Sequence, residues 1–195
     1  MTKRSIPSLK RSDQHPPPLR QYLTASITLA ELAHLTWEHF HGGIRTHHFL
    51  NSPDMPAISN AWGALLLPLL AWFLSAFIQK RIALNPDARD SSQKLPMGIV
   101  VGFLGALFFG ILMSISFTSG HETITEYLFM GVLLLALMLP VYRPECVLGF
   151  VRGMTFTFGA ISPTVVASVI AAFSALVHLC VRPFFIGSWC SLWRK

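Results

Sequence analysis

The fold is decided by residues 96–118, which read PMGIVVGFLGALFFGILMSISFT and contain no charged side chain. A helix needs about 20 mostly apolar residues to cross the hydrocarbon core of a bilayer. This stretch therefore predicts a membrane-spanning helix. Working outward, comparable stretches predict an all-α, polytopic helical membrane protein with about six transmembrane helices in a single domain, 21–185. The predicted spans lie near 21–40, 60–78, 96–118, 126–142, 145–161 and 163–182.

The composition agrees with a lipid environment. Hydrophobic residues make up 52% of the chain and charged residues 12%. That much apolar surface exceeds what the core of a soluble domain of 195 residues could bury. The lipid bilayer is therefore the first expected partner, and the expected location is the cell (inner) membrane, as a multi-pass protein.

The basic residues indicate the orientation. With the N-terminus in the cytoplasm, Arg45 is the only Lys or Arg in an outside segment. This asymmetry follows the positive-inside rule and predicts that the N- and C-termini are both cytoplasmic. An alternative with five spans would place the basic C-terminus outside. The net charge of +6 is explained by this topology and requires no nucleic-acid partner.

Both ends of the chain are predicted to be tails. Residues 1–20 are basic and contain Pro16, Pro17 and Pro18, so they are expected to form a disordered, proline-rich cytoplasmic tail. Residues 186–195 are expected to form a short basic cytoplasmic tail. A cleaved signal peptide is the competing interpretation of the N-terminal region.

One stripe of ionisable residues lies on the first predicted span. Glu31, His34, Glu38 and His41 are spaced by three, four and three residues, which places them on one face of a helix. Placing an ionisable side chain in the middle of a bilayer costs about 2.5 kcal/mol or more of free energy, so such residues usually mark a functional site. Carboxylate and imidazole are ligands of zinc, iron and copper. The stripe predicts a transition-metal site, with Glu38 and His41 as the main ligands.

The predicted outer loop, 41–59, concentrates further histidines. Five of the eight histidines in the chain lie between residues 34 and 48. Gly42 and Gly43 are expected to end the helix and let the chain fold back over it. A short connection after the third span adds another histidine on the same side. The candidates for the remaining ligands are His39, His47, His48 and His121.

The sequence leaves three functions open and does not decide whether the protein is an enzyme. The leading hypothesis is a metal-dependent membrane enzyme or a metal-handling protein. The second is a small proton-coupled transporter or permease subunit, in which Glu31 and His34 relay a proton. The third is a non-catalytic assembly or accessory protein that uses the outer loop to bind a membrane-protein partner, or forms a homo-oligomer. A fourth interpretation assigns no activity to Glu31 and His34, which would form a buried hydrogen-bonded pair that fixes the register of the helix.

Arg152 is a second intramembrane ionisable residue. It follows Glu145 by seven residues, which places the two on one helix face. We expect its long side chain to snorkel toward the cytoplasm. The alternative is a contact with an anion or substrate, beside hydroxyl groups such as that of Thr155.

Small residues recur every four positions on two predicted spans, a spacing that lets helix backbones approach closely. The members are Gly98, Gly102, Ala106 and Gly110 in one span, and Ala167, Ala171 and Ala175 in the other. The pattern predicts tight helix packing and has no functional meaning by itself.

Overall fold

The computed structural model describes residues 19–48, 54, 56–84 and 96–181. The predicted tails at 1–20 and 186–195 lie outside these residues, apart from Leu19 and Arg20, which belong to the first helix. Most of the described chain is helical. The α-helices are α1 (Leu19–Phe40), α2 (Gly63–Ala83), α3 (Met97–Thr118), α4 (Glu122–Met138), α5 (Pro144–Phe158) and α6 (Ile161–Leu176).

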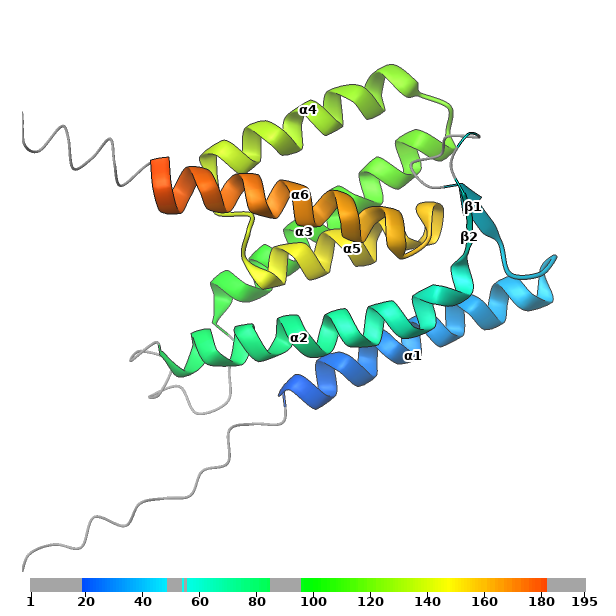
Figure 1. The fold of residues 1–195 in the computed structure, drawn as a ribbon, viewed down its shortest axis with the longest axis horizontal. Helices are drawn as coiled ribbons and strands as arrows, with labels where there is room; N and C mark the ends of the chain where they lie inside the picture. The colour runs from blue at the N-terminus through cyan, green and yellow to red at the C-terminus, as the bar shows by residue number, and fades with distance from the viewer. Residues whose placement is uncertain (1–18, 49–53, 55, 85–95, 182–195) are drawn as a thin grey trace, which may run out of the picture.

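Successive helices run in opposite directions, so the connections between them lie alternately at the two ends of the bundle (Figure 1). A 3-10 turn, η2 (Asn60–Trp62), precedes α2, and a π turn, η4 (Val177–Val181), extends α6. The end of α1 and the start of α2 lie at one end of the bundle, called here the hairpin end. The start of α3 and the start of α5 lie at the opposite end.

Three helical segments are long and apolar enough to cross a membrane, namely Asn60–Ala83, Met97–Thr118 and Ile161–Val181. By contrast, α4 has 17 residues and α5 has 15. Both are shorter than a typical membrane-spanning helix, which has about 20 residues. Helix α1 has 22 residues but contains Glu31 and Glu38. The structure thus contains a helix at each of the six predicted spans and supports three of them as membrane-crossing.

Helix α4 begins and ends four residues earlier than the predicted 126–142. Its end is set by Leu139, which is extended (φ −112°, ψ 147°) and precedes Pro140. The ring of a proline disfavours helical geometry in the residue before it. The apolar run continues past this point, and for that reason hydropathy alone placed the boundary too late.

The segment predicted as an outer loop contains an antiparallel hairpin of β1 (Thr46–His48) and β2 (Ala57–Ser59). Helix α1 stops just before Gly42 and Gly43, whose φ values of 118° and 94° lie in the left-handed region that favours glycine. The predicted end of the helix at these residues is confirmed. The strands have only three residues each, too few to show a period in the sequence.

Helix α5 packs closely against α3 through glycines. A Cβ atom added to Gly149 would overlap the carbonyl oxygen of Phe103, and one added to Gly110 would lie 2.8 Å from the carbonyl oxygen of Phe150. Gly153 faces the same contact. Only part of the predicted repeat in α3 is used, because nothing lies within 4 Å of a Cβ at Gly98. On α5 the contact depends on Gly149 and Gly153, a pair with the same four-residue spacing.

Candidate functional site

Three of the four residues in the predicted stripe are buried on α1. Glu31 is 0% exposed, Glu38 2% and His34 9%. His41 is exposed, and its ring stacks on Trp37 with 4.6 Å between the ring centroids. Its Nδ1 lies 2.8 Å from the carbonyl oxygen of Trp37. Glu38 and His41, the predicted main ligand pair, are therefore not brought together.

His34 lies between the two buried carboxylates. Its Nδ1 is 3.8 Å from Oε2 of Glu31, and its Nε2 is 3.5 Å from Oε1 of Glu38. The ring of Phe156, from α5, covers the imidazole at 4.9 Å between centroids. The three side chains thus form a continuous polar track along the buried face of α1.

Arg152 reaches from α5 to the same track. Its Nη1 lies 3.7 Å from Oε2 of Glu31, and its side chain is 23% exposed. Glu145, which the seven-residue spacing places on the same face of α5, is bound by Arg81 of α2. The contact of Arg152 with Glu31 joins α5 to α1 and could not be inferred from spacing along one helix.

Gly63, the first residue of α2, has no side chain, and the carboxylate of Glu31 occupies the space where a Cβ atom would lie. A Cβ atom at this position would overlap Oε1 of Glu31 and lie 3.4 Å from Cβ of Ala160. Any larger residue would therefore displace the carboxylate. The start of α2 is thus shaped to let Glu31 sit between α1, α2 and α5.

Asn60 anchors the other end of the track. Its Nδ2 donates to both carboxylate oxygens of Glu38 at 3.1 Å, and Asn60 is itself 3% exposed. The backbone N–H of Arg45 donates to Glu38 Oε2 at 3.4 Å. Glu38 therefore ties both sides of the hairpin to α1. Asn60 could not be identified from the sequence, because a single amide beside an apolar run is common.

Replacing Asn60 with leucine should loosen the hairpin. Glu38 would lose its side-chain donor while staying buried, and an unsatisfied buried acceptor costs about 1–3 kcal/mol. We expect faster hydrogen–deuterium exchange in peptides covering 44–48 and 56–62, and unchanged exchange in α4. Thr46→Ala, which alters an exposed side chain of the same hairpin, is the control. Equal protection in Asn60→Leu and the wild type would contradict the anchoring role.

The track has unused hydrogen-bonding capacity. Both carboxylate oxygens of Glu31 and both ring nitrogens of His34 are buried without a hydrogen-bond partner among the described residues, as is Oδ1 of Asn60. A hollow of about 10 Å³ adjoins Asn60 and Gly63, close to the space that a single water needs. Buried polar atoms are normally satisfied. The arrangement is therefore suited to taking up water or a proton.

The track brings groups of opposite charge type together in a buried site. The carboxylates of Glu31 and Glu38 flank the imidazole of His34, and the guanidinium of Arg152 lies beside Glu31. Burying a charged group is costly unless it is paired, so the contact with Arg152 offsets part of the cost of burying Glu31.

The predicted metal ligands whose side chains the structure describes do not assemble into one group. The described part of the chain contains no group of three or more His, Cys, Asp or Glu side chains that could hold a metal ion. The guanidinium of Arg152 and the amide of Asn60 stand where further ligands to Glu31 and Glu38 would be needed. The outlying candidates are His39 and His121, which are exposed, and His47 and His48, which lie on β1.

Comparison of the chain with protein-family models, with curated proteins and with solved structures found no match. The function is therefore inferred from the geometry of the site.

Proposed function

We propose that this protein is a six-span membrane protein, a small transporter or permease subunit, that moves protons through Glu31, His34 and Glu38. Its N- and C-termini lie in the cytoplasm and its hairpin end faces outside. The observation that carries the proposal is the imidazole of His34, held between two buried carboxylates at 3.8 and 3.5 Å. Imidazole beside an intramembrane carboxylate is suited to proton relay.

The surface of α1 supports its placement in lipid. The charged side chains of its stripe face inward, whereas Leu29 and Phe40 are 67% and 77% exposed. A helix on the surface of a soluble protein has the opposite pattern, with its apolar face inward. Helix α4 likewise exposes Tyr127 and Met130. These apolar outer faces favour α1 and α4 as spans despite the charges in one and the length of the other.

The track covers the half of the bundle nearest the hairpin end. Asn60 and the adjoining hollow connect it to that end, so a proton enters there. Arg152 holds Glu31 at the inner limit of the track. Transfer to the opposite end then requires α1 to move against α5, which breaks the pair of Glu31 and Arg152. Alternating access in transporters uses such movements of helix groups around a buried site.

The proposal is tested by proton uptake into vesicles. Purified protein, reconstituted with an enclosed pH-sensitive dye, should acidify the vesicle lumen under an imposed membrane potential. Glu31→Gln should slow uptake by at least about tenfold, or ~1.4 kcal/mol in the barrier, because an amide cannot exchange the proton. His121→Gln, at an exposed position outside the track, should keep the wild-type rate.

Two further measurements separate the alternatives. Glu31→Asp retains a carboxylate and should keep part of the proton uptake. This result would show that Glu31→Gln loses uptake because it lacks the carboxylate and not because it misfolds. Wild-type uptake no faster than in protein-free vesicles would contradict the proposal and favour the accessory role. A stoichiometric amount of zinc, iron or copper in untagged protein, lost in Glu38→Ala, would instead favour metal handling.

A further inference from the structure

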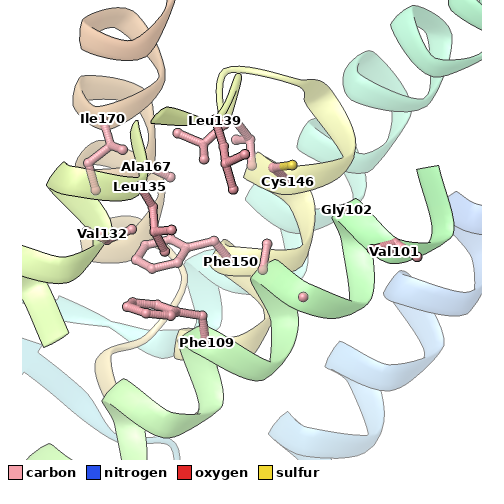
Figure 2. A pocket seen from close by; sticks show the side chains of 14 residues that line it. Val101, Gly102, Phe109, Val132, Leu135, Leu139, Cys146, Phe150, Ala167 and Ile170 are labelled. Carbon is pink, nitrogen blue, oxygen red and sulfur yellow. The ribbon is translucent and has the colours of Figure 1, made fainter. Parts of the chain in front are cut away.

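An apolar groove lies between α4 and the helices α3, α5 and α6. It has a volume of about 350 Å³, within the range of about 300–1,000 Å³ typical of ligand sites. Its walls come from α3, α4, α5 and α6, and its residues include Gly105, Phe109, Leu135, Phe150 and Ile170. Figure 2 shows the rings of Phe109 and Phe150 close together at one end, with Cys146 and Leu139 toward the other.

The lining excludes polar ligands from the body of the groove. Of the 14 lining residues, only Cys146 carries a heteroatom in its side chain, and a thiol is a weak hydrogen-bonding group. A polar ligand would lose its hydrogen bonds to water and gain none. The groove therefore suits a hydrocarbon chain.

The groove runs from the middle of the bundle toward the end opposite the hairpin. Val101 at the start of α3, Leu139 after α4 and Cys146 at the start of α5 all line it, and these residues lie near that end. Arg143 lies between the lining residues Val141 and Cys146 in the chain and is half-buried. Among the described residues no carboxylate pairs with it. Arg143 thus lies near the mouth of the apolar groove, with no carboxylate partner among the described side chains.

We infer that the groove holds one acyl chain of an anionic membrane lipid, with its phosphate headgroup bound by Arg143. The chain would fill the apolar space between α4 and the neighbouring helices α3, α5 and α6. Basic residues at the cytoplasmic face of a membrane attract anionic headgroups, which fits the orientation proposed for this end. The inference depends on placement of the protein in a bilayer but not on proton transfer by Glu31 and His34.

The groove can be filled without disturbing the helices. Nothing lies within 4 Å of a Cβ atom at Gly105, so Gly105→Leu places its side chain in the space where the lipid chain would lie. Gly98→Leu is the matched control, because Gly98 is also an open position on α3 but does not line the groove. Arg143→Gln removes the headgroup contact alone.

The test uses photoreactive phosphatidylglycerol and phosphatidylcholine, each with a diazirine in one acyl chain, in vesicles of otherwise identical composition. In the wild type and Gly98→Leu, the anionic lipid should label peptides of α3 and α5 that line the groove. Gly105→Leu should reduce this labelling to background. Arg143→Gln should remove the preference for the anionic lipid and leave labelling by the zwitterionic lipid unchanged.

Three outcomes would overturn the inference. Equal labelling of the groove in Gly105→Leu and Gly98→Leu would show that the acyl chain lies elsewhere. Equal labelling by the two lipids in the wild type would exclude recognition of the headgroup by Arg143. A change of oligomeric state in Gly105→Leu, with labelling unchanged, would identify the groove as a contact for a second copy of the chain.

Discussion

Replacing Arg152 with methionine is expected to lower the free energy of unfolding by about 3–5 kcal/mol, because breaking a buried ion pair leaves a buried charge without compensation. Glu31 is 0% exposed, and the guanidinium of Arg152 is the only Lys or Arg group that pairs with it among the described residues. Methionine keeps most of the apolar length of the side chain, so packing against α1 changes little. Unfolding by sodium dodecyl sulfate in mixed micelles, followed by far-UV circular dichroism, measures the loss.

The double substitution Arg152→Met with Glu31→Gln should recover much of that stability, because the uncompensated carboxylate is then gone. Arg45→Met is the control, since Arg45 is an exposed arginine whose side chain forms no ion pair in the described structure. A loss in Arg152→Met no greater than in Arg45→Met would contradict the role assigned to the pair.

Gly149→Ala is expected to destabilise the protein toward the upper end of about 1–3 kcal/mol, the usual cost of overpacking. The added methyl group would overlap the backbone oxygen of Phe103, which belongs to a helix and cannot move independently. The two helices must therefore separate along their closest contact. The same detergent unfolding measurement applies.

Gly105→Ala is the matched control for this prediction and should act in the opposite direction. Its Cβ atom meets nothing within 4 Å, so only the higher helix propensity of alanine remains, about 0.5–1 kcal/mol in favour of the variant. If the two glycine variants had equal stability, the close contact of α3 with α5 would not contribute as described.

The sequence predicted features that depend on local periodicity. Hydropathy located the six helices, and the three- and four-residue spacings correctly placed Glu31, His34 and Glu38 on one face of α1. His41 follows the same spacing and its N–H still donates to the carbonyl oxygen of Trp37, but it lies at the end of α1, where its ring stacks on the exposed Trp37. No helix in the described part of the chain covers this last turn of α1 on that side, so the side chain of His41 is exposed and does not join the buried face. The prediction of a ligand pair failed at this boundary.

The partners of the stripe could not be predicted because they come from distant segments. Arg152 and Asn60 reach Glu31 and Glu38 only after α5 and η2 pack against α1. The pairing of Arg81 with Glu145 joins residues 64 positions apart. A single sequence holds no periodic signal for such contacts. The close approach of Gly149 and Gly153 to α3 likewise depends on tertiary packing.

The two ion pairs of α5 also bear on biogenesis. Helices α1 and α2 are synthesised before α5, and the partners of Glu31 and Arg81, namely Arg152 and Glu145, both lie on α5. Neither ion pair can therefore form until α5 has been made. The last link between α5 and the first two helices is thus also the one that compensates the buried carboxylate of Glu31.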